Sequence, residues 1–168
     1  ARHAGDVATI RARIAAGDTY QVNHTFRQSA PFDGDPADIY GRLARAQSGG
    51  YGALLETGRW AVASASPELF LEWSGGVLTS RPMKGTAPRG IDEAEDAERR
   101  TALLDSPKER AENLMIVDMV RNDMGRVAVP GTVRVPALFE AERYDTVWQL
   151  TSTVSARTRP GTTLVDVF

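Results

Sequence analysis

The sequence contains no cysteine and only two histidines, His3 and His24. The absence of cysteine excludes disulfides and thiolate metal sites, and it agrees with the cytoplasmic location that we expect. A metal ion would have to be bound by carboxylates, because two scattered histidines cannot supply most of a ligand set. Carboxylate ligands favour Mg²⁺ or a similarly hard cation.

Long apolar runs are absent as well. No run approaches the ~20 residues that span a bilayer, and residues 1–6 lack the apolar stretch of a secretory signal. The net charge of -2 leaves no excess of positive charge for nucleic acid, because acidic residues balance the arginines. We therefore expect no membrane and no nucleic acid among the partners. The 168 residues, 42% of them hydrophobic, suffice for one sizeable core.

Lysine is the scarcest charged residue, with two lysines against 18 arginines. Lys84 lies between Pro82 and Gly85, in a predicted loop that is stiff on one side and allows close backbone approach on the other. A desolvated lysine can lose its proton and act as a nucleophile, whereas a guanidinium cannot. Lys84 is therefore a candidate for chemistry, and the alternative is an ordinary solvated lysine. Lys108 has no comparable rationale.

The pattern of apolar residues predicts an α+β fold, with a mostly antiparallel sheet system and helices packed outside it. Helices are predicted at 7–16, 35–47 and 106–125, and an exposed helix or ordered loop at 90–105. Strands are predicted at 19–28, 51–56, 59–65, 69–73, 77–80, 132–144 and 146–157. We expect the four strands between 51 and 80 to form one antiparallel meander, from whose last strand the lysine loop leaves.

The clearest helix begins at Ser106, where an N-cap serine, Pro107 and Glu109 form a capping-box pattern. Residues 114–120 are apolar nearly all round, which predicts a helix buried on most sides. Glu112 would lie about one turn into this helix, where an unpaired carboxylate is costly. It needs a metal or a cation, and a salt bridge to a residue such as Lys108 is the structural alternative.

The last residues look like the start of a helix, with a cap at Thr162 and Thr163 followed by apolar residues at 164–168. A domain does not ordinarily stop one turn into an apolar helix. We therefore expect the 168 residues to be part of a longer protein.

Five segments become informative when taken together: I-R-A-R-I-A-A-G-D-T-Y-Q-V-N at 10–23, S-P-E-L-F-L at 66–71, R-P-M-K-G-T-A-P-R-G at 81–90, E-R-A-E-N-L-M-I-V-D-M-V-R-N-D at 109–123 and Y-D-T-V-W-Q-L-T-S-T-V at 144–154. In sequence and order they resemble the chorismate-utilising enzymes, over nearly the whole chain. The resemblance implies that residues 1–168 are a partial chorismate-binding catalytic domain. The family's N-terminal domain and the C-terminal third of its catalytic domain would be absent, and we expect the isolated fragment to be inactive.

Two positions imply which reaction the family member performs. Gln21 matches the glutamine of the amino-transferring enzymes, whereas the water-using isochorismate and salicylate synthases carry a lysine there. Lys84 is similar to the lysine of aminodeoxychorismate synthase component I, where anthranilate synthases typically have alanine. The resemblance thus implies amination of chorismate to 4-amino-4-deoxychorismate, on the path to p-aminobenzoate and folate. The alternatives are an anthranilate synthase component I and a non-catalytic binding or scaffold fragment.

The resemblance also implies roles for single residues. Lys84 would be the nucleophile, and Glu68 the general acid and base, although on the residues alone Glu68 could be a strand-start glutamate paired to an arginine. Gly85 and Thr86 would donate hydrogen bonds to the substrate. Gln149 lies in the segment where many members carry a histidine near the departing hydroxyl, and glutamine can donate a hydrogen bond there but cannot carry a proton.

Metal and partners follow from the same resemblance. Glu112 matches the metal carboxylate and Glu109 an outer-shell or capping acid for Mg²⁺, which would neutralise the ring carboxylate of chorismate. A glutamine amidotransferase subunit or domain would supply the ammonia. Strand edges left exposed in the fragment could pair into a homodimer.

Overall fold

The computed structural model describes residues 2–47 and 50–168, which divide into two compact units, Ala1–Gly34 and Asp35–Phe168. In the first unit, α1 (Arg2–Ala15) confirms the helix predicted at 7–16 but begins earlier in the chain. Gly17, at φ +81°, follows the helix end in the left-handed conformation typical of glycine. No helix within the two described ranges is long and apolar enough to cross a membrane.

The predicted strand at 19–28 is wrong. Residues 21–33 contain no regular element, and the large side chains of Tyr20 and Phe26 are about 70% exposed (70% and 69%). A strand needs a neighbour that supplies ladder hydrogen bonds. No other strand in the described part of the chain pairs with this segment, so its alternating pattern has no sheet to join.

The second unit begins with α2 (Pro36–Ala46), which confirms the helix predicted at 35–47. The Asp35 side chain caps it by accepting a hydrogen bond of 2.8 Å from the backbone N–H of Ala37. Next, β1 (Ala53–Glu56) and β2 (Ala61–Ser64) form a two-stranded antiparallel sheet of their own, against which α2 packs.

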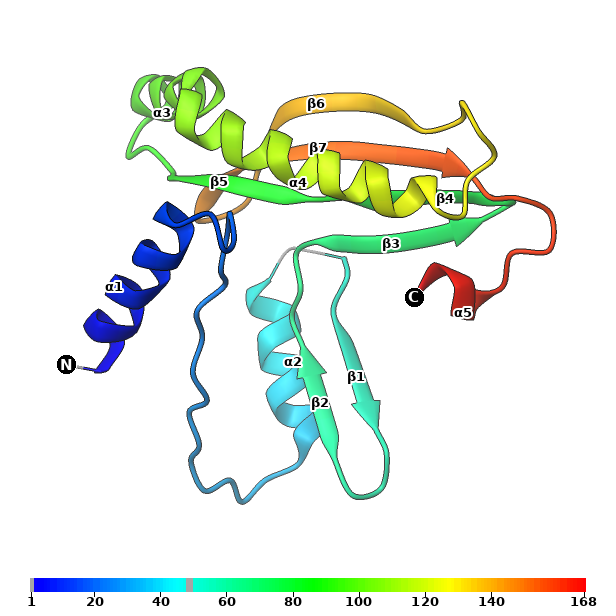
Figure 1. The fold of residues 1–168 in the computed structure, drawn as a ribbon. Helices are drawn as coiled ribbons and strands as arrows, with labels where there is room; N and C mark the ends of the chain where they lie inside the picture. Colours follow the sequence, from blue (N-terminus) through cyan, green and yellow to red (C-terminus); the bar gives the residue numbers. More distant parts are fainter. Residues whose placement is uncertain (1, 48–49) are drawn as a thin grey trace. The chain divides into compact units, whose positions relative to one another are not determined.

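The main sheet has five antiparallel strands: β3 (Leu69–Ser74), β4 (Val77–Arg81), β5 (Met83–Pro88), β6 (Arg134–Arg143) and β7 (Val147–Arg157). The long strand β7 lies at its centre (Figure 1). β4 and β5 pair with successive halves of β7, and β6 pairs with it too.

Two predictions about this region are wrong. The strands between 51 and 80 do not form one meander, because β1 and β2 form one sheet and β3 and β4 belong to another. The predicted lysine loop is mostly the strand β5. Pro82 has no N–H and interrupts the ladder between β4 and β5. Its carbonyl still accepts a hydrogen bond of 3.2 Å from the backbone N–H of Ser152 on β7, so the chain continues along the same strand.

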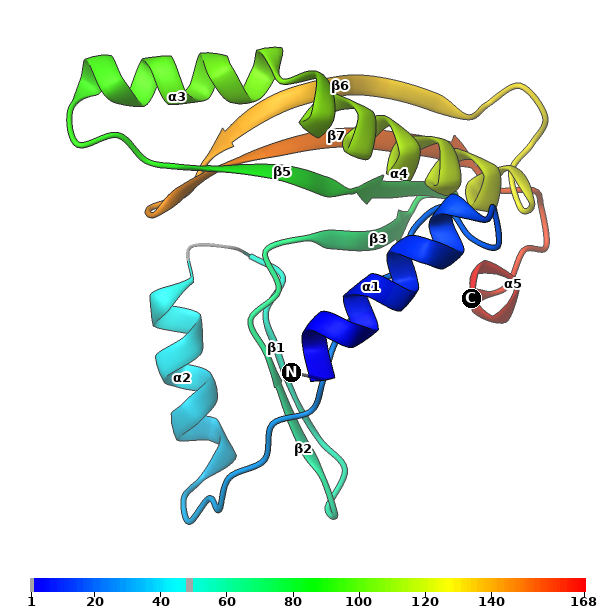
Figure 2. The same cartoon turned by 60° about the vertical axis from the view of Figure 1, so that its left-hand side comes forward.

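Two helices, α3 (Glu93–Asp105) and α4 (Pro107–Gly125), cover one face of the main sheet (Figures 1 and 2). Under α4, Val117 and Met124 pack with Leu78 of β4 and with Val154 and Ala156 of β7. Under α3, a smaller cluster joins Leu103 to Trp148 and Leu150. Alternate residues of β7 therefore form the core beneath the helices.

The expectation that α4 is buried on most sides is wrong. Val117 is 1% exposed, whereas Leu114 and Met119 are each 43% exposed. Only one side of the helix meets the sheet, so an apolar sequence all round it does not produce burial all round it. The short α5 (Leu164–Val167) does confirm the predicted C-terminal helix, and Thr163 caps it.

An ion pair fastens α3 to the sheet. Asp96 accepts hydrogen bonds from Arg89 Nε (2.7 Å), from the backbone N–H of Gly90 (2.8 Å) and from Trp148 Nε1 (2.9 Å). A Cβ at Gly90 would lie 2.2 Å from the backbone nitrogen of Asp96, so only glycine allows this approach. The hydrogen bond from Arg89 is the main cause that lowers the pKa of Asp96. The charged segment at 90–105 is thus largely solvated, but it carries one anchor, Asp96, whose side chain is only 14% exposed.

Replacing Asp96 with asparagine should lower the free energy of unfolding at neutral pH, because Arg89 loses its charged partner. The pKa of Asp96 is lower in the folded state than in the unfolded state. Its stabilisation is therefore complete above the unfolded pKa of about 3.9 and is lost as the pH falls below that value. Urea unfolding followed by tryptophan fluorescence at about pH 7 and about pH 3 should show a smaller loss on acidification in Asp96→Asn than in the wild type.

Asp118→Asn is the matched control, because Asp118 forms an exposed pair with Arg121 on α4. Its acid sensitivity should equal that of the wild type. Equal acid sensitivity in Asp96→Asn would show that the anchor is absent.

Candidate active site

Strand β5 carries three of the predicted site residues in succession: Lys84, Gly85 and Thr86. The pairing of β5 with β7 shifts register between Met83 and Thr86. Lys84 and Gly85 therefore lie where the regular ladder is interrupted, and their backbone groups need partners from elsewhere.

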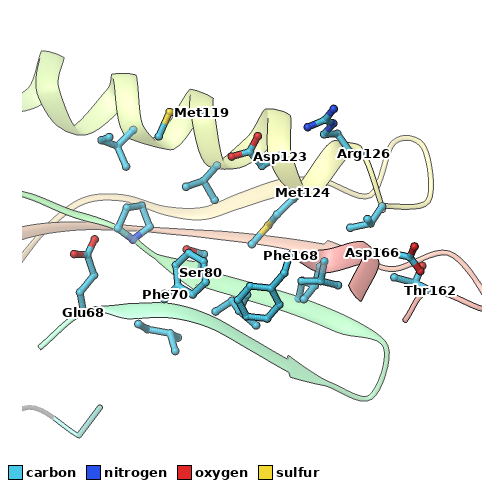
Figure 3. A pocket seen from close by; sticks show the side chains of 18 of the residues that line it. Glu68, Phe70, Ser80, Met119, Asp123, Met124, Arg126, Thr162, Asp166 and Phe168 are labelled. Carbon is cyan, nitrogen blue, oxygen red and sulfur yellow. The ribbon is translucent and has the colours of Figure 1, made fainter. Parts of the chain in front are cut away.

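Lys84 and Glu68 line one pocket, of about 1060 Å³, between the sheet, α4 and the C-terminal segment. Both side chains bind the backbone of Met83. Its N–H donates to Glu68 Oε1 (2.9 Å), and its carbonyl accepts from Lys84 Nζ (3.1 Å). Figure 3 shows Glu68 at one end of this pocket and Asp166 at the other. The amine and the carboxylate thus flank a single residue.

The walls between these ends are largely apolar. They are formed by side chains of β3, β4, α4 and the C-terminal residues, among them Leu71, Leu78, Ile116, Val120 and Phe168. Ser80, Asp123 and Arg126 also line the pocket between its two ends (Figure 3). Apolar walls combined with several polar groups are typical of a small-molecule site.

Gly85 brings the strand against the first turn of α4. Its φ of +97° lies in the left-handed region, and a Cβ at this position would lie 3.1 Å from Cβ of Glu109 and 3.1 Å from Cβ of Leu150. The backbone conformation therefore favours glycine, and a side chain at this position would push against its neighbours. As a result, the Glu109 carboxylate lies beside the backbone of β5.

Glu109 and Glu112 both reach the same cation. The ammonium Nζ of Lys108 lies 2.9 Å from Glu109 Oε1 and 3.2 Å from Glu112 Oε1. The salt bridge from Glu112 to Lys108, which the sequence left open as an alternative, is present. The Glu112 side chain is 47% exposed. Hydrogen bonds to Glu109 and then Glu112 raise the pKa of Lys108. Ser106 caps the helix as predicted, accepting from the Glu109 N–H at 3.4 Å.

The two carboxylates fit part of a Mg²⁺ site. Within residues 2–47 and 50–168 no group of three or more His, Cys, Asp or Glu side chains could hold a metal. Mg²⁺, however, is often bound by one or two carboxylates, with water and substrate completing its shell. Glu109 and Glu112 supply two such carboxylates, whose oxygens already converge on the Lys108 ammonium. Neither Glu109 nor Glu112 lines the pocket of Lys84, so of the predicted site residues this pocket brings together Lys84 and Glu68 but not the two acids of α4.

Thr86 and Gln149 pair across the strands, where Thr86 Oγ1 donates to Gln149 Oε1 at 3.0 Å. Gln149 lies between Trp148 and Leu150, which belong to the core under the helices. Successive side chains of a strand point to opposite faces, so Gln149 and Thr86 lie on the face away from α3 and α4. They are thus separated by the sheet from the pocket of Lys84.

Gln21 belongs to the unit Ala1–Gly34. There its backbone carbonyl accepts a hydrogen bond of 3.1 Å from Thr19 Oγ1. The other predicted site residues all lie in the second unit.

Asn113 is the residue that sequence reasoning missed. Its side chain is fully buried on α4, and its Nδ2 donates to the backbone carbonyls of Leu150 (3.0 Å) and Lys84 (3.4 Å). Its Oδ1 accepts from Ser152 Oγ at 2.6 Å, and Ser152 Oγ accepts from the N–H of Phe139 at 3.1 Å. One amide therefore joins α4 to β5 and β7, and through Ser152 to β6. The signal available in the sequence was a polar residue at the start of an apolar helical run. If such a residue is buried, its amide must be hydrogen-bonded, which marks it as a residue that joins elements.

Comparison with known proteins identifies the family. The family described as chorismate binding enzyme matches residues 2–168. The chain belongs to this family. The family and the α+β fold predicted from the sequence are confirmed, whereas the roles of the site residues stay predictions.

Relatives of this chorismate binding enzyme carry two activities in their names. The chain is 47% identical to aminodeoxychorismate synthase component 1 of Klebsiella aerogenes over 148 residues, covering 88% of the chain and 33% of that protein. It is 42% identical to anthranilate synthase component 1 of Streptomyces coelicolor over 161 residues, covering 95% of the chain and 32% of that protein. The chain thus spans about a third of the length of these curated relatives.

A solved structure shares the fold. Anthranilate synthase component I of Streptococcus pneumoniae superposes with a TM-score of 0.70 at 32% identity, over 81% of this chain and 29% of that one.

In this chorismate binding enzyme, replacing Asn113 with alanine should lower the free energy of unfolding by about 2–4 kcal/mol, because it leaves a cavity and unsatisfied buried partners. Urea denaturation measures the loss. Asn122→Ala on the exposed side of the same helix should stay within about 0.5 kcal/mol of the wild type. Similar losses in the two variants would contradict the role of the buried amide.

Replacing Gly85 with alanine should lower the free energy of unfolding by more than the loss of a glycine with positive φ alone explains. Gly58 has φ +80° and nothing within 4 Å of the position that a Cβ would take, so Gly58→Ala should cost only the backbone penalty of about 1–2 kcal/mol. Gly85→Ala should add about 1–3 kcal/mol for the overpacked contact with Glu109 and Leu150. Thermal unfolding of both variants provides the comparison, and equal losses would mean that the neighbours of Gly85 give way freely.

Proposed function

We propose that this chain is the central part of an aminodeoxychorismate synthase component 1, which aminates chorismate to 4-amino-4-deoxychorismate with ammonia derived from glutamine. The observation that carries the proposal is the placement of Lys84 in one pocket with Glu68. The sequence resemblance associates a lysine at this position with amination at C4, and an alanine with anthranilate formation. The relatives named aminodeoxychorismate synthase support the proposal further.

The first step is a displacement by Lys84. Its amine attacks C2 of chorismate, the two ring double bonds shift, and the C4–O bond breaks. Glu68 gives a proton to the departing hydroxyl, which leaves as water. Lys84 Nζ is held in the free enzyme by the carbonyl of Met83. Since this acceptor is neutral, no ion pair has to be broken before the amine can act as a nucleophile.

The second step reverses the first. Ammonia attacks C4, the double bonds shift back, and the C2–N bond to Lys84 breaks. The amine of Lys84 is released, and the Glu68 carboxylate accepts the proton that ammonia loses. The two successive displacements leave the ring double bonds where they began, which one displacement at C2 would not.

The neighbouring residues bind and orient the substrate in this proposal. Glu109 and Glu112 would hold a Mg²⁺ ion, which when bound neutralises the ring carboxylate of chorismate. Gly85 contributes a backbone without a side chain. The resemblance also assigns Thr86 and Gln149 to the substrate, although both lie on the other face of the sheet from the pocket of Lys84 and pair with each other.

The whole enzyme is proposed to be larger than this chain. We infer an N-terminal domain, a C-terminal third of the catalytic domain and an amidotransferase partner or domain, in a cytoplasmic enzyme of p-aminobenzoate and folate synthesis. The isolated chain should be inactive, and its sheet edges could pair two copies.

The test uses the full-length protein that contains this chain, with chorismate, ammonium and Mg²⁺. Chromatography should show 4-amino-4-deoxychorismate, and direct formation of anthranilate would favour the anthranilate synthase alternative instead. Lys84→Ala should lower the rate by at least about 10³-fold, as removal of a nucleophile does. Intact-mass analysis without ammonium should detect a chorismate-derived adduct in the wild type and none in Lys84→Ala.

Arg121→Ala serves as the control, because Arg121 forms an exposed pair with Asp118 outside the pocket. It should keep the wild-type rate. Unchanged turnover in Lys84→Ala would refute the covalent role of this lysine.

A further inference from the structure

Lys108 is the second of only two lysines in the chain, and the sequence alone gives no reason for it. In the structure its Nζ lies 2.9 Å from Glu109 Oε1 and 3.2 Å from Glu112 Oε1. Its ammonium therefore occupies the point at which the two carboxylates converge.

Helix stability does not explain a lysine at this place. Lys108 lies in the first turn of α4, directly after Pro107. A positive charge at a helix N-terminus opposes the helix dipole. A lysine four residues before a glutamate is also the less favourable order for a helical ion pair. The position is therefore better explained by the two acids than by the helix.

We propose that the Lys108 ammonium is a built-in substitute for the metal: it holds Glu109 and Glu112 together when no Mg²⁺ is bound, and the metal must displace it. Lys108 thereby sets the metal affinity of the site. The inference rests on the proposed function, in which these two acids bind Mg²⁺.

The exposure of the three side chains fits such an exchange. The Lys108 side chain is 71% exposed, so its ammonium can move into water without unpacking the protein. Glu109 is 22% exposed and packs on Gly85, which keeps its carboxylate in place. Glu112 is 47% exposed and can adjust.

The choice of lysine also fits. An ammonium is a compact charge on a flexible stem, and exposed ion pairs of this kind are weak. A guanidinium would present a planar fork that can bind two carboxylates at once. In a chain that otherwise uses arginine, lysine at this position gives a counter-ion that a dication can replace.

The experiment measures Mn²⁺ binding to the full-length protein without chorismate, from the electron paramagnetic resonance signal of free Mn²⁺. Lys108→Gln should tighten binding by about three- to tenfold, because the metal no longer displaces an ammonium from two weak ion pairs. Lys108→Arg should weaken binding, because a bidentate partner is harder to displace.

Arg110→Gln is the matched control. It removes a positive charge from the same turn, but the Arg110 guanidinium packs over the Phe139 ring, with its carbon 4.7 Å from the ring centroid. Arg110→Gln should therefore change the Mn²⁺ affinity much less than Lys108→Gln. Equal tightening in the two variants would mean that general charge and not displacement is responsible, and would overturn the inference.

Glu112→Gln separates this inference from the proposed metal site. Weaker Mn²⁺ binding in Glu112→Gln together with no tightening in Lys108→Gln would refute only the role of Lys108. If Glu112→Gln leaves Mn²⁺ binding unchanged, or if the wild type binds no Mn²⁺, the acids of α4 are not the metal site, and both proposals about them fall.

Discussion

The arrangement of the site depends on the buried amide of Asn113. The register shift in β5 leaves the Lys84 carbonyl outside the regular ladder with β7, and Asn113 supplies the missing donor. The same side chain binds the Leu150 carbonyl and the Ser152 hydroxyl. Because a buried polar group without a partner is costly, this network permits one position of α4 on the sheet. A helix held only by apolar contacts could slide by a fraction of a turn.

Fixing Asn113 also fixes the acids on the same helix. Glu109 precedes Asn113 by four residues, about one turn, and so lies on the same side of α4. It therefore faces the sheet where Gly85 leaves room for it. Glu112 is adjacent to Asn113 and is therefore turned about 100° from it around the helix, which agrees with its greater exposure. One helix thus determines where the Lys84 backbone lies and where the two carboxylates can meet a cation.

Local rules made much of the fold predictable from the sequence. Asp35, Ser106 and Thr163 each cap the helix that their position predicted, because capping involves groups only a few residues apart. The strand at 19–28 and the single meander were wrong, because strand pairing joins distant segments that periodicity does not identify. The resemblance identified Lys84 and Glu68, but the hydrogen bonds of both to Met83 and the whole Asn113 network depend on tertiary contacts.

The two lysines illustrate how environment divides one residue type into two roles. Within residues 2–47 and 50–168 Lys84 makes no ion pair, and its Nζ binds the carbonyl of Met83 at the edge of the pocket. Lys108 instead lies between two carboxylates, which raise its pKa and keep it charged. An amine that loses no ion pair on reacting suits nucleophilic attack, whereas an amine held by two acids suits charge compensation. Arginine could do neither: it is not a nucleophile at neutral pH, and its bidentate grip would compete too strongly with a metal.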